Sequence, residues 1–172
     1  MIQVFTFSTI WYIINYYVRM REIEMGIRKL DIATFSDKIK YVPIGKLDCN
    51  IINFISKQKP ELKDRLSSDK DILFWSDRVK YTEKHRKDFS SSEEFDKCLE
   101  DIPDIIQNPD YISINPNDDS ICFIRKYTKY VTVAVRISGD GKMGYRTMYP
   151  LRDSQLQNYI ENNRAWKYKE IT

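Results

Sequence analysis

The stretch YVTVAVRISGDGKMGYRTMY, residues 130–149, decides the fold of this chain. Apolar and polar side chains alternate in its first eight residues, as they do in β-strands that bury one face, and KMGYRTMY at 142–149 is predicted as the next strand. The SGDG sequence between the two segments is typical of a hairpin turn. In the first strand, the residues predicted to face the core are Val131, Val133, Val135 and Ile137. Those predicted to point to the opposite face are Thr132, Ala134, Arg136 and Ser138.

Two further strand patterns precede this hairpin, and a helix pattern follows it. YISIN at 111–115 and ICFIRKY at 121–127 are strand-like, and a turn sequence lies between them. DSQLQNYIENN at 153–163 has helical spacing, and Asp153 or Ser154 can cap its N-terminus. Because only short turns connect the strands, the pattern predicts an antiparallel meander of four strands and gives no support to a parallel βαβ arrangement.

Helical patterns dominate the chain before the meander. The clearest is SSSEEFDKCLEDIP, where Ser91 or Ser92 caps a helix with an apolar stripe. Asp48 and Asp77 are placed to cap two others, CNIINFISKQ and DRVKYTEKHRKDF. ILFW, 72–75, fits either a short strand or the entry to a helix. The predicted fold class is therefore α+β, with N-terminal helices packed on one face of the four-stranded antiparallel β-meander and a C-terminal helix.

Composition bounds the kinds of site that the chain can carry. The chain has 172 residues, is 42% hydrophobic and can bury a core, but its net charge of +3 is too small to indicate nucleic-acid binding by itself. Cys49, Cys98 and Cys122 form no CxxC pair, so we expect free thiols in a reducing cytoplasm and no zinc site. His85 is the only histidine, which excludes a two-histidine acid/base pair within one chain. We expect no metal and no cofactor.

The N-terminal segment is unlike the rest of the chain. Met1–Val18 carries no charged side chain and is barely long enough for a membrane span, with basic residues after it. Several polar side chains weaken this interpretation, and translation from Met20 or Met25 is an alternative. We divide the chain into 1–39, an apolar segment and linker, and 40–172, the main domain. Membrane association is not favoured, and the expected compartment is the cytoplasm.

No phosphate-binding glycine loop, GxSxG elbow or HExxH motif is present. What remains is a basic and hydroxylated set: Lys84, His85, Arg86, Arg125, Lys126, Arg136, Arg146, Thr147 and Tyr149. A ribonuclease that uses the 2′-hydroxyl of its substrate needs a base, a cation for the phosphorane and an acid for the leaving oxygen. Histidine suits proton transfer near neutral pH, and arginine grips phosphate with a planar fork.

Each residue of this set also has a structural interpretation. A single histidine in a charged helix is usually a solvated surface residue, and strand arginines are usually exposed charges. Thr147 and Tyr149 are good strand formers that share one face of their strand. Arg146 points to the other face unless a bulge intervenes, so periodicity alone leaves open which arginine belongs to a site.

Four segments in order carry a family resemblance: WSDRVKYTEKH at 75–85, LEDIPDIIQNPDYI at 99–112, VAVRI at 133–137 and RTMYP at 146–150. With the lead-in IGKLD before them, they resemble the phage-encoded PBECR group of barnase/EndoU/colicin/RelE-like (BECR-fold) nucleases. The resemblance covers roughly residues 44–168. It rests on the ordered set, since no single motif is specific.

The resemblance implies a barnase/RelE-like fold and a toxin-like or phage-encoded endoribonuclease that cleaves RNA, with tRNA as one candidate, without metal. It implies His85 as general base or acid, oriented by Glu83, and Arg136 or Arg125 as the phosphate-binding cation. Thr147 and Tyr149 then line the site, and an immunity or antitoxin protein is a candidate partner. Two alternatives remain: a non-catalytic RNA- or protein-binding domain of the same fold, and a membrane-tethered interaction protein.

Overall fold

The computed structural model describes residues 29–168. The apolar segment Met1–Val18 and the alternative starts at Met20 and Met25 lie outside the described residues. Within 29–168, no helix is both long and apolar enough to cross a lipid bilayer. The domain boundary at residue 40 stays a prediction. Leu30 nevertheless lies in the main core, and its backbone N–H donates to the carbonyl of Glu100 at 2.8 Å.

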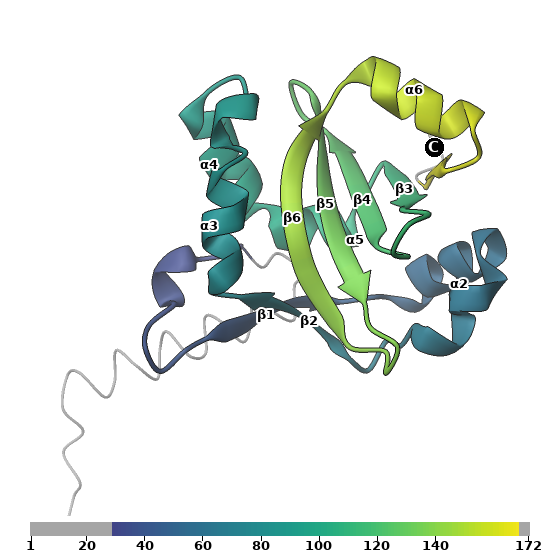
Figure 1. Cartoon of the computed structure of the whole chain (residues 1–172), viewed down its shortest axis with the longest axis horizontal. Helices are drawn as coiled ribbons and strands as arrows, with labels where there is room; N and C mark the ends of the chain where they lie inside the picture. The colour runs from purple at the N-terminus through teal and green to yellow at the C-terminus, as the bar shows by residue number, and fades with distance from the viewer. Residues whose placement is uncertain (1–28, 169–172) are drawn as a thin grey trace, which may run out of the picture.

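The chain forms one seven-stranded mixed sheet with helices around it, so the α+β class is correct (Figure 1). The strands are β1 (Tyr41–Lys46), β2 (Asp71–Trp75), β3 (Tyr111–Ile114), β4 (Ile121–Lys126), β5 (Tyr130–Ile137), β6 (Met143–Leu151) and β7 (Ala165–Lys167). Their order in the sheet is β1-β2-β6-β5-β4-β3-β7. The four predicted strands are β3 to β6, which are antiparallel neighbours.

A sheet limited to those four strands was the wrong prediction, because three more strands extend the meander. β1 carries Pro43 and Gly45, and its register shifts between them; proline is tolerated on such an edge strand but weakens a strand pattern. β2 pairs with β6 in parallel through only two residues, Ile72 and Leu73. Local turns between neighbouring strands give no signal for such a long-range parallel pair.

The helices are α2 (Cys49–Gln58), α3 (Asp77–Glu83), α4 (Ser92–Glu100), α5 (Ile102–Gln107) and α6 (Asp153–Glu161). Two predicted caps are confirmed: the Asp48 side chain accepts from the N–H of Ile51 at 2.7 Å, and that of Ser91 accepts from the N–H of Glu94 at 3.1 Å. α3 is shorter than its pattern, since the chain turns at His85 into a 3-10 helix. The N-cap of α6 is Arg152, one residue before the predicted cap.

The main core lies on the sheet face that the helical region covers, and the four residues predicted to face it are buried there. α5 lies behind the sheet in Figure 1 and contributes Ile102, Ile105 and Ile106 to this core. A fully buried aliphatic side chain of this size contributes about 1.5–3 kcal/mol to stability, so this layer fixes the orientation of β5. The opposite face is partly covered too, because α6 packs Leu156 against Ile124.

A bulge in β6 decides which side chains reach that opposite face. Ala134 pairs with Thr147 while the next residue of β5 pairs with Tyr145, so Arg146 is the extra residue. The bulge lets Tyr145 stack on Phe74 in the core, with ring centroids 4.2 Å apart. It also frees Arg146 from strict alternation.

Candidate active site

The candidate site lies on the sheet face opposite the main core, between α3 on one side and α6 on the other (Figure 1). Directly paired residues of neighbouring strands share a face. Tyr149 pairs with Thr132, and Thr147 pairs with Ala134. Thr147 and Tyr149 therefore share this face, as the sequence predicted, and alternation along β5 adds the exposed Arg136 to it. We call this surface the open face.

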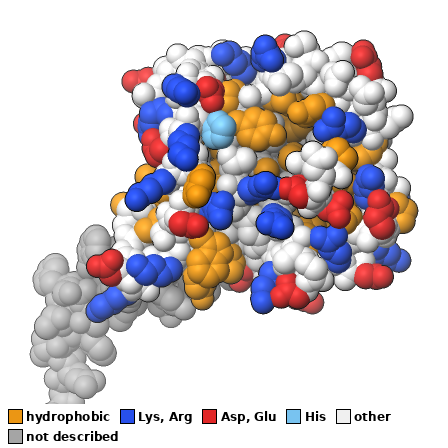
Figure 2. All heavy atoms as spheres, in the orientation of Figure 1, with side chains coloured by type: hydrophobic (Ala, Val, Ile, Leu, Met, Phe, Trp, Pro, Cys, Tyr) orange, Lys and Arg blue, Asp and Glu red, His pale blue; other side chains and the backbone are white. Residues whose placement is uncertain are grey.

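His85 joins the open face from the turn that follows α3. Its ring centroid lies 6.0 Å from that of Tyr149. Its Nδ1 atom lies 3.0 Å from Oδ2 of Asp88, and 36% of its side chain is exposed. Figure 2 shows the histidine at the border between the charged side chains of the helical region and an apolar patch on the sheet. The turn thus brings an accessible imidazole beside β6.

The middle of the open face holds two protonated groups. Burial raises the pKa of the Cys122 thiol to about 11, with Tyr149 and Arg164 as smaller opposing influences. Burial, with the neighbouring Cys122, also raises the pKa of Tyr149. The Tyr149 phenol therefore keeps its proton at neutral pH and can donate a hydrogen bond. The buried hydroxyl of Thr132 has no hydrogen-bond partner within residues 29–168.

The strand arginines separate into three environments. Arg125 pairs with Val131, a core-facing residue, and its guanidinium forms a salt bridge with Asp104 of α5, away from the open face. Arg146 binds the carboxylate of Asp118. Arg136 is exposed, and its side chain makes no hydrogen bond or ion pair with any other described residue. The structure thus leaves Arg136 as the strand arginine whose charge is available to a ligand.

A fourth arginine was not predicted. Arg164 follows α6, and its guanidinium lies over the ring of Tyr159, 4.8 Å from the centroid. Its Nε is buried and finds no hydrogen-bond acceptor in the described part of the chain. It lies close enough to Cys122 to favour the thiolate. The sequence offers no signal for this residue, because its position depends on how α6 returns across the sheet.

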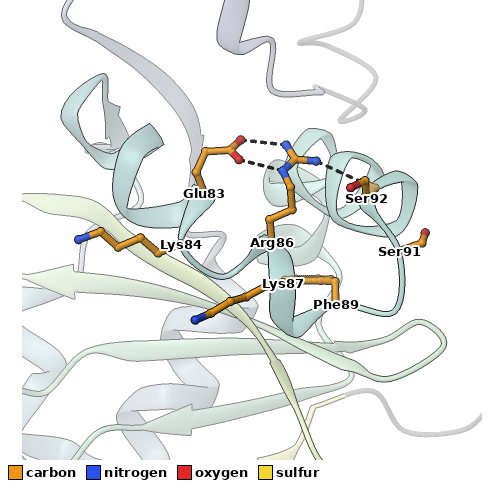
Figure 3. A pocket seen from close by; sticks show the side chains of 7 residues that line it. All are labelled: Glu83, Lys84, Arg86, Lys87, Phe89, Ser91 and Ser92. Atoms are coloured by element: carbon orange, nitrogen blue, oxygen red, sulfur yellow. Dashed lines mark hydrogen bonds and ion pairs between the residues drawn. The ribbon is translucent and has the colours of Figure 1, made fainter.

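The remaining basic residues flank the open face. Lys84 and Arg86 line a hollow of about 440 Å³ beside α4 (Figure 3). Glu83 does not orient His85 as expected: it binds Arg86 at 2.8 and 2.9 Å, and Asp88 takes its place at the imidazole. Asp96 also binds this guanidinium, at 2.8 Å. The hydrogen bonds that Arg86 donates to Glu83 and to Asp96 raise its pKa, so its charge is already compensated.

Lys126 lies near the opposite end of the open face, at the N-terminus of α6. Its Nζ is 3.3 Å from Asp153 and lies over the Tyr130 ring at 4.1 Å. Of the predicted residues, His85 lies beside Tyr149, and Thr147 and Arg136 are on the same sheet face as Tyr149. Arg136 is opposite Gly144, near the start of β6, and Arg146 binds Asp118. Among residues 29–168, no three His, Cys, Asp or Glu side chains are grouped as metal ligands would be.

The comparisons with known proteins give one positive result. The family model described as phage-Barnase-EndoU-ColicinE5/D-RelE like nuclease 3 (PBECR3) matches residues 51–158. The match contains His85, the whole β3–β6 meander and the bulge of β6, whereas Arg164 follows it. Neither the curated proteins nor the solved structures that were searched gave a significant match.

Proposed function

Because the chain belongs to the PBECR3 family of phage barnase/EndoU/colicin E5/D/RelE-like nucleases, we propose that it is an endoribonuclease that uses the 2′-hydroxyl of RNA as the nucleophile and needs no metal ion. One observation carries this proposal. His85 and Tyr149 come from distant segments and have ring centroids 6.0 Å apart, on a sheet face that also presents the guanidinium of Arg136, which has no ion-pair partner within 29–168. A base, a proton donor and a cation are the groups that the reaction requires.

In the first step, His85 accepts the proton of the 2′-hydroxyl while the 2′-oxygen attacks the phosphorus. The bond from phosphorus to the 5′-oxygen then breaks, which leaves a 2′,3′-cyclic phosphate on one fragment and a 5′-hydroxyl on the other. Asp88 supports the role of base: if its carboxylate accepts from Nδ1–H, the other ring nitrogen carries the lone pair. The same arrangement orients imidazoles in catalytic triads.

Charge stabilisation falls to the arginines in this proposal. The phosphorane carries more negative charge than the phosphodiester, so a cation aimed at it lowers the barrier. The fork of Arg136, which no other residue of 29–168 engages, can bind two phosphoryl oxygens. Arg146 already forms an ion pair with Asp118, so we assign it a smaller part in stabilising the phosphorane.

Tyr149 is the proposed donor to the 5′-oxygen or to a phosphoryl oxygen. A second histidine is absent from the sequence, so the acid must be another group or His85 after it has been protonated. Burial and Cys122 raise the pKa of Tyr149 and keep the phenol protonated, which suits a donor. Thr147, on the same face, completes the lining of the site.

The test is cleavage of total tRNA by the full chain in the presence of EDTA, beside His85→Ala and the control Lys57→Ala. Lys57 is exposed on α2, which lies on the opposite side of the molecule from α3 in Figure 1. We expect wild type and the control to cut and to leave cyclic-phosphate ends, and His85→Ala to be at least 100-fold slower, on the order of a lost general base. Equal cutting by all three would contradict the proposal. Folded protein that binds the RNA without cutting it would favour the non-catalytic binding domain.

A further inference from the structure

Three aromatic side chains, one each on β1, β2 and α3, are unusually exposed. The exposed fractions of Tyr41, Trp75 and Tyr81 are 50%, 44% and 51%. Tyr41 and Trp75 pair across the two strands, with ring centroids 4.8 Å apart. Aromatic side chains of this size usually bury most of their surface, so exposed rings on three elements that follow or pair with one another indicate contact with a partner.

Two cations lie over the ring of Tyr81. The Cζ of Arg78 lies 5.1 Å from the centroid of the Tyr81 ring, and the Nζ of Lys84 lies 4.7 Å from it. Residues 78, 81 and 84 recur every three positions and so lie along one side of α3 and its C-cap. From Asp77 to Asp88 the chain carries five Lys or Arg against three Asp or Glu, and one of those acids, Glu83, is held by Arg86. The surface is therefore aromatic and net positive.

This surface also leads directly to the candidate active site. Lys84 is followed in the chain by His85, whose ring borders Tyr149. Figure 2 shows Lys or Arg side chains and apolar side chains next to one another over the α3 region, on the same face of the molecule as the histidine. From Asp77 to His85 a helix rises by about 12 Å, and bases stack at about 3.4 Å, so a few nucleotides span the distance.

We propose that these residues, the α3 stripe (Tyr41, Trp75, Arg78, Tyr81 and Lys84), bind single-stranded RNA that flanks the scissile phosphate. The inference rests on the proposed function, since it says where the substrate of the same site runs and that this part of the substrate is single-stranded. Bases stack on the exposed rings and the cations contact the backbone phosphates. Bases in an intact duplex are stacked on one another and offer no free faces to the rings, so the stripe selects unpaired segments.

The test measures binding separately from cleavage. A fluorescein-labelled single-stranded RNA with 2′-O-methyl groups at every position lacks the nucleophile and remains intact. We expect Tyr81→Ala and Trp75→Ala in the full chain to weaken its binding about tenfold each, the usual effect of removing a stacking ring, while Tyr81→Phe retains it. A duplex of the same sequence is expected to bind more weakly than the single strand. Circular dichroism checks that each variant is folded.

Two further readouts report on the stripe itself. Lys84→Gln is expected to reduce the slope of log affinity against log salt by about 0.7, the value for one phosphate contact to a single strand, and Lys57→Gln to leave it unchanged. Stacking should quench tryptophan fluorescence in the wild type and in Trp166→Phe, and Trp75→Phe should abolish most of the quenching. Trp166 lies on β7, at the opposite edge of the sheet.

The outcomes separate this inference from the proposed function. If wild type cuts RNA but Tyr81→Ala and Trp75→Ala bind the methylated strand as wild type does, the α3 stripe is overturned and the ribonuclease stands. If the methylated strand binds through the α3 stripe but no RNA is cut, the α3 stripe stands and the ribonuclease proposal is overturned. If the wild type binds no oligonucleotide even at low salt, the inference is overturned, and the stripe becomes a surface for a protein partner.

Discussion

The Nδ1 atom of His85 lies 3.0 Å from Oδ2 of Asp88, within one turn of chain between α3 and α4. A carboxylate at this distance fixes the ring and the tautomer, because it accepts from only one of the two ring nitrogens. Asp88 is therefore a positioning residue in the proposed reaction: it touches the proposed base and not the substrate.

Asp88→Ala is expected to lower kcat about tenfold and to leave KM nearly unchanged. The expected loss is a part of the ~10²–10⁴-fold contribution of a whole general base, because His85 remains but is less well oriented. Steady-state cleavage of a short RNA checks this. Asp69→Ala serves as the control, since Asp69 is an exposed carboxylate away from the turn. A loss in KM alone would indicate that Asp88 acts on binding.

Arg136 and Arg125 are expected to respond in opposite ways to replacement by alanine. Arg136→Ala should reduce kcat by roughly 100-fold and change the free energy of unfolding little, because the side chain makes no hydrogen bond or ion pair in the described part of the chain and faces the proposed phosphate. Arg125→Ala should leave kcat nearly unchanged and cost about 1 kcal/mol of stability, because Asp104 loses a half-exposed salt bridge. Cleavage rates and urea unfolding of the two variants measure both effects.

Arg136→Lys refines this comparison. Lysine keeps the charge but not the planar fork, so we expect only partial recovery of kcat relative to Arg136→Ala. If Arg125→Ala instead abolished cleavage in a stable protein, the phosphate would have to lie on the α5 side of the sheet, and the open face would be the wrong site.

Tyr149→Phe is expected to lower kcat by about 10- to 100-fold, as the loss of one proton donor does, with little change in the unfolding transition. The hydroxyl is the only group removed, and the ring still packs against the apolar cluster that contains Leu151 and Leu156. Tyr159→Phe is the matched control, since Tyr159 lies in the same apolar cluster on α6. Equal rates for Tyr149→Phe and wild type would leave His85 to serve as both base and acid.

The meander was predictable because its information is local. Alternation over 130–137 and the SGDG turn correctly predict β5, the hairpin and the four core-facing residues. The same reasoning placed Thr147 and Tyr149 on one face. β1, β2 and β7 were harder to predict because a proline, a glycine or a length of three residues hides the pattern, and because the β2–β6 pair joins segments far apart in the chain.

Residue spacing could not predict which side chains of different helices and strands bind one another. Glu83 and Asp88 are equally plausible neighbours of His85 in sequence, and only the end of α3 at Glu83 decides between them. The difference between Arg125 and Arg136 depends on strand register and on Asp104 of another element. The roles of these residues in catalysis stay predictions.

The three cysteines are expected to differ strongly in reactivity. Cys49 is exposed, whereas Cys98 and Cys122 are buried. Burial raises the pKa of Cys98 to about 12 and that of Cys122 to about 11, so both remain thiols at pH 8, and only a thiolate attacks a disulfide reagent. Titration of the native protein with Ellman's reagent at pH 8 should therefore give one fast thiol, and titration in urea should give three.

The raised pKa values of the two buried thiols should also make the folded protein less stable at alkaline pH. An unfolded thiol ionises near 9.0, whereas the folded thiols keep their protons to about 11 or 12. Protons are therefore bound more tightly by the folded state, and the free energy of unfolding falls as pH rises from 9 towards 11. Cys49→Ser should remove the fast reaction at pH 8 and leave this alkaline loss unchanged. Rapid labelling of Cys122 in native Cys49→Ser would mean that the centre of the open face is open to solvent.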